Sequence, residues 1–202
     1  MVEGMTDQAH EAEGALPGKP TAASRTTLSH IMTGSETNLY GTVHGGVIMK
    51  LADDAAGAVA GRHSEGPAVT ASMDEMVFLE PVRVGDLVHV KAQVNWTGRT
   101  SMEVGVRVVA ERWNESTPAT HVGTAYLVFA AIDESGTPRP VPPVVPETDE
   151  DRRRFQEAQI RRTHRDSMAT YSRVWRTLRE SAVYGADAHN VINAARRDLN
   201  AR

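Results

Sequence analysis

Apolar and polar residues alternate with a period of two along the middle of this chain. From residue 88 to residue 96 every second position is apolar: Val88, Val90, Ala92, Val94 and Trp96. This alternation is typical of a β-strand that buries one face. Residues 102–108 repeat the pattern, and the linking residues Thr97 to Thr100, which include Gly98, predict a hairpin turn.

The sequence predicts three more strands. Residues 68–79 form the first, which ends where Pro81 and Gly85 interrupt the pattern. Residues 120–132 are apolar on both faces, as expected for an internal strand of a sheet. A shorter strand is expected over residues 26–32, before a loop that leads into a helix.

A helical period predicts one long helix from Gly45 to about Arg62. Its apolar stripe would pack on the sheet and comprises Val47, Ile48, Leu51, Ala52, Ala55, Ala58 and Val59. The opposite face groups Asp53 with the small residues Ala56, Gly57 and Ala60. Such a strip suits the close approach of another backbone or a thin ligand, so we expect Asp53 to be covered. The alternative is that Asp53 and Asp54 are both solvated carboxylates on an exposed helix.

One strand, one helix and four further strands cannot make a doubly wound parallel sheet, which needs a crossover helix between most strands. The pattern predicts an α+β fold, with a single antiparallel sheet wrapped around one long helix. We expect a disordered tail over residues 1–24, one globular domain over 25–146 and a helical C-terminal extension over 147–202.

The extension begins after a proline-rich stretch, 138–146, that must be extended. Thr148 and Asp151 have the spacing of a capping box at the start of a charged helix that runs to about Arg165. Beyond it an apolar stripe recurs at helical spacing, and Gly185 marks a break before a weaker helical pattern. The stripe is Tyr171, Val174, Trp175, Leu178 and Ala182.

Composition excludes several classes of protein. A net charge of -4 argues against a dedicated nucleic-acid binder. No apolar run is long enough to span a membrane, and the first residues lack the features of a signal peptide, so we expect a cytoplasmic protein without membrane contact. The chain has no cysteine, which excludes disulfides, thiolate catalysis and cysteine-bound metals.

Candidate chemistry gathers where the helix begins. His44, Gly45 and Gly46 form a turn directly before it, and Asp53 follows nine residues after the histidine. Glycines let a backbone approach a ligand closely, and the free N–H groups of a helix's first turn can stabilise an oxyanion. Asp53 would then act as a general base or as a nucleophile.

Other kinds of site fit less well. A metal site built from His44, Asp53 and His63 would need spacings of 9 and 10 residues, unlike the pairing of helical zinc motifs, so we predict none and expect His44 to cap the turn. Ser72 or Ser101 as a nucleophile lacks the G-x-S-x-G elbow.

The order of elements and a set of motifs resemble one family. The motifs are Asn38, then His44-Gly45-Gly46, then Leu51-Ala52-Asp53, followed by residues 69–74, 101–104 and 140–148. Together they resemble the hot-dog-fold acyl-CoA thioesterases, in the acyl-CoA hydrolase branch that includes the brain-type cytosolic long-chain enzymes. The resemblance covers roughly residues 29 to 164.

The resemblance implies hydrolysis of fatty acyl-CoA to a free fatty acid and CoA, without a cofactor. It also implies a homodimer with the site at its interface, assembled into a hexamer as a trimer of dimers. In such a site Gly45 and Gly46 would donate N–H groups to the thioester carbonyl, Asp53 would come from the partner chain, and Asn38 would orient the water or the carbonyl. Contacts to CoA would involve Arg99, Ser101 and Thr70.

Two other functions remain open. A hot-dog hydratase or dehydratase acting on acyl thioesters would place its own histidine against the reacting carbons, whereas here His44 sits in the glycine turn. A non-catalytic acyl-CoA-binding module is the other alternative. A hydrolysis screen over acyl-CoAs separates these classes.

Overall fold

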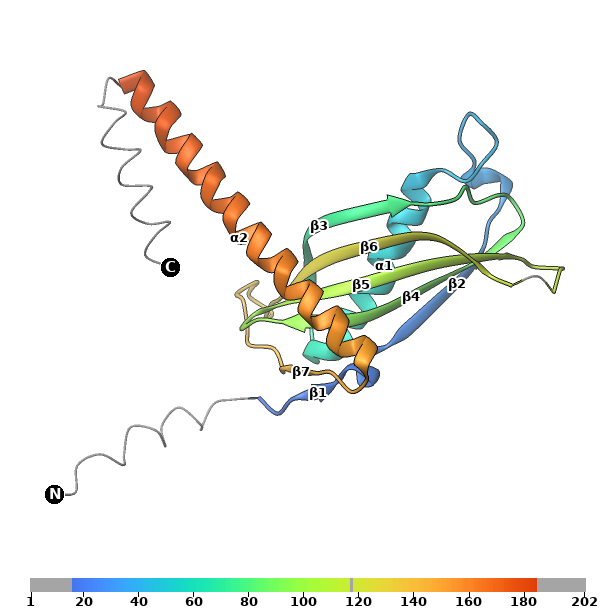
Figure 1. The fold of residues 1–202 in the computed structure, drawn as a ribbon, viewed down its shortest axis with the longest axis horizontal. Coiled ribbons are helices and arrows are strands. Elements are labelled where there is room, and N and C mark those ends of the chain that lie inside the picture. The colour runs from blue at the N-terminus through green and yellow to red at the C-terminus, as the bar shows by residue number, and fades with distance from the viewer. Residues whose placement is uncertain (1–15, 117, 185–202) are drawn as a thin grey trace. The chain divides into compact units, whose positions relative to one another are not determined.

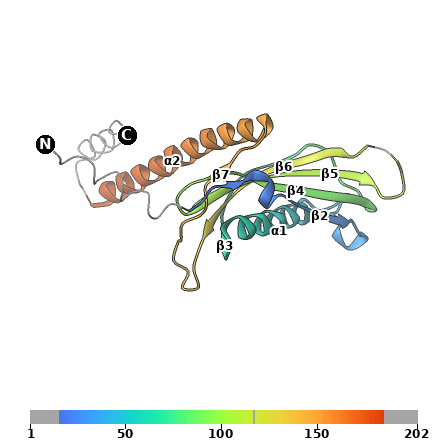
Figure 2. The same ribbon diagram turned by 90° about the horizontal axis from the view of Figure 1, so that it is seen from below.

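A five-stranded antiparallel sheet carries the long helix on one face (Figure 1, Figure 2). The computed structural model describes residues 16–116 and 118–184, with side chains as far as residue 169. The sheet has the order β2-β4-β5-β6-β3, and its strands are β2 (Thr26–Ile31), β3 (Ala68–Phe78), β4 (Asp86–Thr97), β5 (Ser101–Arg112) and β6 (Thr120–Ala131). Helix α1 (Gly45–Ser64) packs on all five of these strands. The prediction of an antiparallel sheet around one helix is confirmed.

The core lies between α1 and the inward faces of the strands. Alternate valines of β4 and β5 are buried there, as the period of two predicted, together with Leu127 and Phe129 of β6. Strand β6 lies between β5 and β3, so its prediction as an internal strand is confirmed.

The buried face of α1 is wider than its predicted stripe. Ala56 and Ala60, which we placed on the opposite face, are fully buried, whereas Ala58 of the stripe is exposed. A sheet that curls around a helix covers a broader sector of the helix than a flat one does. The small residues therefore let the sheet approach closely, and of the predicted strip only Asp53 and Gly57 remain partly open.

Strand β3 lies at one edge of the sheet and pairs only with β6 among the described strands. Its register shifts twice, between Thr70 and Ser72 and between Met73 and Glu75. Several of its apolar side chains are exposed, including Val69 and Phe78. An apolar edge strand of this length is a surface on which a second chain can pair.

Order begins earlier in the chain than predicted. Strand β1 (Lys19–Pro20) pairs in parallel with β7 (Val144–Val145), and the 3-10 helix η1 (Thr21–Ser24) follows β1. The expected disordered tail over 1–24 is therefore wrong for residues 19–24, because a pairing between two dipeptides so far apart leaves no local pattern in the sequence. Residues 1–15 lie outside the described part of the chain.

Helix α2 (Asp149–Tyr184) starts at the predicted cap. The Asp151 N–H donates to Thr148 Oγ1 and the Thr148 N–H to Asp151 Oδ2, at 3.1 and 3.2 Å. The helix is continuous to Tyr184 rather than ending near Arg165, since no glycine or proline interrupts it. The side chains of the predicted apolar stripe and the pattern after Gly185 lie outside what the structure describes. The chain divides into two compact units within α2, between Phe155 and Gln156.

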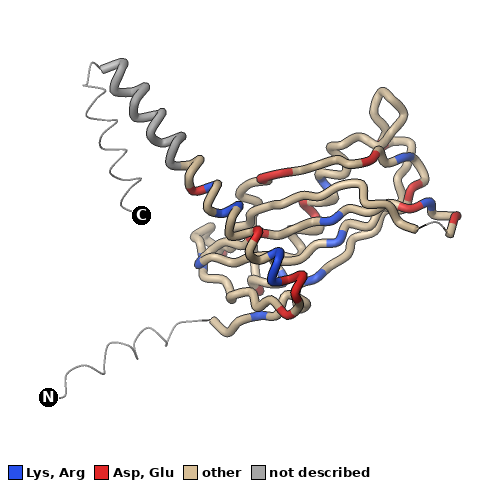
Figure 3. Tube along the Cα trace, viewed as in Figure 1, with Lys and Arg blue, Asp and Glu red and all other residues tan. Residues whose placement is uncertain are grey.

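Charged residues are dense in the first turns of α2 and sparser along the strands of the sheet (Figure 3). Glu150 pairs with Arg153 and Arg154, and the hydrogen bonds from these two guanidinium groups lower the pKa of Glu150 to about 2. Within residues 16–184, apart from 117, no helix is both long and apolar enough to cross a membrane.

Candidate active site

The turn before α1 is fixed by its own histidine. His44 is the N-cap of the helix, and its Nδ1 accepts a hydrogen bond from the Gly46 N–H at 2.9 Å. The His44 N–H in turn donates to the Glu36 carbonyl at 2.8 Å. The predicted capping role of His44 is confirmed. The Gly46 N–H, which we expected to stabilise an oxyanion, is instead occupied by the cap.

Gly45 differs from Gly46. Its N–H has no acceptor among the described residues. A Cβ on Gly45 would lie 3.4 Å from Cζ of Phe78, so the aromatic ring of the edge strand covers this glycine closely. The first N–H of α1 is thus the one available donor of the His-Gly-Gly turn, at the positive end of the helix dipole.

Asn38 shapes the loop that precedes this turn. Its Oδ1 accepts from the Tyr40 N–H at 2.8 Å and the Thr42 N–H at 3.3 Å, while its Nδ2 donates to Thr42 Oγ1 at 2.8 Å. Leu39 and Tyr40 at the tip of the loop are almost completely exposed, and the loop extends beyond β3 in Figure 1. Asn38 therefore holds two large apolar side chains outside this chain's own core.

Asp53 and Asp54 occupy different environments. Asp53 is partly buried on α1, and its Oδ1 accepts a hydrogen bond from Thr70 Oγ1 of β3 at 2.7 Å. Asp54 is exposed and pairs with Lys50 one helical turn away, at 2.6 Å. The structure thus separates a carboxylate positioned by a neighbouring strand from one that belongs to the solvated face.

Gly45 and Asp53 are too far apart to act on one carbonyl within a single chain. They are eight residues apart on the same helix, which at 1.5 Å per residue is about 12 Å along its axis. A base or nucleophile must reach within about 3 Å of the group it acts on. A site that combines the two needs Gly45 of one chain and Asp53 of another.

The three predicted CoA contacts lie toward one end of the sheet. Arg99 is exposed in the turn between β4 and β5, and its carbonyl accepts from the Val141 N–H at 3.0 Å. Ser101 pairs with Ala130 of β6, one position from the residue that pairs with Thr70. Thr70 is the one of the three that reaches Asp53, a contact that sequence spacing did not suggest.

His63 lies away from this site. It is 1% exposed at the C-terminal end of α1, and its Nε2 donates to the Pro142 carbonyl at 2.9 Å. Burial lowers its pKa, so it is held neutral. No cluster of three potential metal-binding side chains occurs in the described residues, and the structure does not bring His63 to His44 or Asp53.

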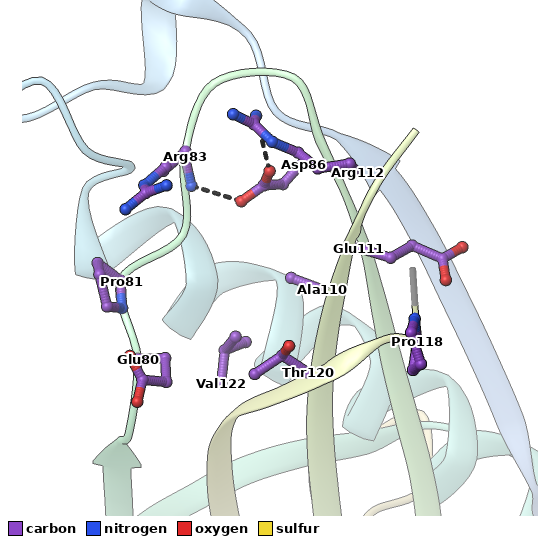
Figure 4. A pocket seen from close by; sticks show the side chains of 10 residues that line it. All are labelled: Glu80, Pro81, Arg83, Asp86, Ala110, Glu111, Arg112, Pro118, Thr120 and Val122. Atoms are coloured by element: carbon purple, nitrogen blue, oxygen red, sulfur yellow. Dashed lines mark hydrogen bonds and ion pairs between the residues drawn. The ribbon is translucent and has the colours of Figure 1, made fainter. Parts of the chain in front are cut away.

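Two cavities open near the end of β3. One, of about 360 Å³, lies against Gly45 and is lined mostly by apolar side chains. The other, of about 280 Å³, is polar (Figure 4). In it Asp86 accepts from the Arg83 N–H at 2.8 Å and from Arg112 at 3.1 Å, which ties the connection after β3 to the end of β5. None of the predicted site residues lines the polar cavity.

Comparisons with known proteins agree with this fold. The model of the thioesterase superfamily matches residues 40–115. The mouse cytosolic acyl coenzyme A thioester hydrolase is 36% identical over 139 residues, which is 68% of this chain and 36% of that protein. An uncharacterised acyl-CoA thioester hydrolase of Bacillus subtilis is 42% identical over 116 residues, or 57% of this chain and 67% of that protein. The chain thus spans only about a third of the mouse relative.

Solved structures match over more of their length. A hexameric acyl-CoA thioesterase is 36% identical with a TM-score of 0.73, covering 76% of this chain and 98% of that one. An acyl-CoA hydrolase of Staphylococcus aureus, solved with butyryl coenzyme A and coenzyme A, is 30% identical with a TM-score of 0.74, covering 82% and 99%. Variants of the same hydrolase, with an aspartate, an asparagine or a threonine changed to alanine, match equally well. The chain belongs to the thioesterase superfamily, among the acyl-CoA thioester hydrolases of hot-dog fold.

Proposed function

We propose that this protein hydrolyses the thioester of fatty acyl-CoA to the free acid and CoA, at a site formed by two copies of the chain. The observation that carries the proposal is the separation of the two chemical parts. Gly45 offers a free N–H, and Asp53 is oriented by Thr70, yet about 12 Å of helix lies between them. Antiparallel pairing of two α1 helices would bring each Gly45 toward the other chain's Asp53.

In this arrangement the N–H of Gly45 polarises the thioester carbonyl and stabilises the oxyanion that forms on it. Asp53 of the second chain acts from the other side. As a general base it takes a proton from water, whose oxygen attacks the carbonyl carbon; as a nucleophile it attacks that carbon itself and water then releases the acid. In both cases the C–S bond breaks and the sulfur leaves as the CoA thiol.

The Staphylococcus aureus variants support the same set of residues. In that hydrolase the changed asparagine precedes the changed aspartate by 15 residues, and the changed threonine follows it by 17. Asn38, Asp53 and Thr70 are separated by the same numbers of residues. We therefore assign Thr70 to positioning Asp53 rather than to CoA, and Asn38 to the Gly45 half of the site, where it would orient the water or the carbonyl.

The assembly we propose is a homodimer paired along β3, with three dimers forming a hexamer. Two of the solved relatives, the acyl-CoA thioesterase described above and a thioesterase of Yersinia pestis, are hexameric. The open apolar edge of β3 and the exposed Leu39 and Tyr40 are the surfaces that such a partner would cover. We also propose a cytoplasmic location, in keeping with the mouse relative's description as cytosolic.

Complementation tests the shared site directly. Chains carrying Asp53→Ala and Asn38→Ala, with different affinity tags, are co-expressed and assayed for CoA release from acyl-CoAs with a thiol reagent. If the two residues act from different chains, each mixed dimer holds one intact site, and random pairing restores about one quarter of wild-type activity. Each variant expressed alone is the control. No restoration in a mixed assembly would mean that both residues act within one chain.

A further inference from the structure

The two halves of the proposed site are anchored at opposite edges of the sheet. Asp53 is held by Thr70 of β3, at one edge. The loop before α1, which carries Asn38 and leads to His44, is tied instead to β2 at the other edge (Figure 1). The residue that makes this second connection is Glu36, which the chemistry described so far does not use.

The carboxylate of Glu36 accepts hydrogen bonds from His30 and Thr33. Its Oε1 accepts from His30 Nε2 of β2 at 2.8 Å, and its Oε2 accepts from the N–H and the Oγ1 of Thr33, at 2.7 and 2.9 Å. The hydrogen bond from the Thr33 N–H is the largest of the effects that lower the pKa of this carboxyl group. Glu36 is therefore ionised near neutral pH, where its side chain accepts hydrogen bonds and donates none.

The main chain of Glu36 leads directly to the glycine turn. Its carbonyl accepts the His44 N–H at 2.8 Å. Beyond this bond the two sides of the loop continue as a short antiparallel pair, with Thr37 opposite Val43 and the Asn38 N–H donating to the Thr42 carbonyl at 2.8 Å. Since His44 is the N-cap of α1, its position also sets the direction of the Gly45 N–H.

We propose that Glu36 is a positioning residue for the reaction, because it holds the Gly45 half of the site in the geometry that the thioester requires. The inference rests on the proposed thioesterase function. Glu36 acts through other residues: its carbonyl fixes the backbone of His44, and Asn38 follows it by two residues in the same antiparallel pair. A misplacement of about 1 Å in a catalytic site can cost about 100-fold in rate. Losing the anchor should therefore lower kcat and leave KM nearly unchanged.

The first experiment measures kcat and KM for CoA release by Glu36→Ala and Glu36→Gln. Glu36→Ala removes every hydrogen bond of the carboxylate, and its kcat should fall by about 10- to 100-fold. Glu36→Gln keeps the shape of the side chain and an oxygen that can accept the Thr33 N–H, so it should retain most of the activity. Glu111→Ala is the matched control, because Glu111 also pairs with a histidine, His89 at 3.3 Å, but on strands β5 and β4. Its kcat and KM should be those of the wild type.

Mixed dimers show which half of the site Glu36 serves. Co-expressed with Asp53→Ala, the Glu36→Ala chain leaves one intact site in each mixed dimer, so random pairing restores about one quarter of wild-type activity. Co-expressed with Asn38→Ala it leaves none, because both changes lie in the Gly45 half. A general loss of stability would not depend on which partner is chosen. Equal activity with the two partners, in assemblies where Asp53→Ala and Asn38→Ala do complement each other, would overturn the assignment.

Hydrogen exchange tests the anchor without reference to activity. The Glu36 carbonyl protects the His44 N–H in the wild type, so a peptide that spans residues 43–48 should exchange about two- to tenfold faster in Glu36→Ala and at the wild-type rate in Glu111→Ala. Light scattering checks the assembly of each variant. If Glu36→Ala does not assemble, His30→Phe, which removes only the hydrogen bond from β2, takes its place with the same expected pattern.

Three results would count against these proposals. Unchanged kcat in an assembled Glu36→Ala would overturn the positioning role. A loss in Glu36→Gln as large as in Glu36→Ala would overturn it too, since the charge rather than the hydrogen bonds would then act. If the wild type released CoA from no acyl-CoA while the exchange changed as expected, the proposed function would fail and Glu36 would be an anchor of the turn only.

Discussion

Replacing Thr70 with valine removes one hydrogen bond from Asp53 and little else. Valine has nearly the shape of threonine, and the bond from Thr70 Oγ1 to Asp53 Oδ1 is 2.7 Å long. A hydrogen bond to a charged group contributes about 1.5 to 3 kcal/mol, and each 1.36 kcal/mol is a factor of about ten in rate. We therefore expect kcat to fall by about 10- to 150-fold. The lower limit applies if the pair stays open to water, and the upper limit if a second chain covers it.

The assay is CoA release at saturating and subsaturating acyl-CoA, so that kcat and KM are separated. A positioning role lowers kcat and leaves KM nearly unchanged, whereas a contact to CoA would raise KM with kcat unchanged. Thr70→Ser keeps the hydroxyl and should retain most of the activity. The reasoning is refuted if Thr70→Val matches the wild type, or if the serine variant is impaired as severely as the valine variant.

The other predictions concern the helix face, two buried groups and the assembly. Asp53→Ala should lower kcat by about 10² to 10⁴ with little change in Tm, and Asp54→Ala should do much less; equal losses would mean that the two carboxylates are not distinguished. Burial lowers the pKa of His63 in the folded chain, so as the pH falls the unfolded chain binds a proton at this histidine before the folded chain does. The stability that the neutral ring provides is therefore complete above the unfolded pKa of about 6.5 and is lost as the pH falls below that value. The drop in Tm between pH 7.5 and pH 5 should be smaller in His63→Gln, and an unchanged drop would assign the acid sensitivity to other groups. Asp151→Ala removes a carboxylate that is 1% exposed and caps α2, and should lower the free energy of unfolding in urea by about 2 kcal/mol. Asp149→Ala changes a side chain that is 98% exposed and should lower it by less than about 0.5 kcal/mol. Light scattering should give a particle several times the 21.9 kDa of one chain, and an active monomer would contradict the shared site.

The sheet and its helix could be predicted because their signals are local. Alternation along residues 88–96 reflects one buried and one more open face of β4. Residues 102–108 alternate in the same way in the sequence, but in β5 the positions Glu103 and Gly105 are buried too, because this strand lies in the middle of the sheet. The capping box at Thr148 could also be predicted from the sequence, since its two partners are three residues apart. The predictions that were wrong concerned features that depend on contacts between residues far apart in the sequence. Ala58 was expected to be buried and is exposed, whereas Ala60 was expected on the open face and is buried. The curvature of the sheet, rather than the helix period, sets the width of the buried face of α1.

The candidate site could be predicted in part, because some of its signals are local in the sequence as well. The spacing of the glycine turn and Asp53 placed both on one helix, and the helix face separated Asp53 from Asp54. The capping role of His44 was expected, but the spacing did not show which N–H its ring would occupy; Nδ1 accepts from Gly46, which removes that N–H from the site. The bond between Thr70 and Asp53 joins a strand to a helix across 17 residues, so only the folded chain shows that the threonine serves the carboxylate.

The pairing of β1 with β7 bears on the order in which the molecule folds. It joins Lys19 and Pro20 to Val144 and Val145, so a loop of well over a hundred residues must close for a ladder only two residues long. The strands β4, β5 and β6 follow one another through short connections and can pair at a smaller cost in chain entropy. We expect this pairing to close last and to open first in native-state hydrogen exchange, ahead of any strand of the sheet. Lys19 also donates to the carbonyls of Pro143 and, through Nζ, of His63. Each such opening would therefore admit water to the C-terminal end of α1 while the five-stranded sheet stays closed.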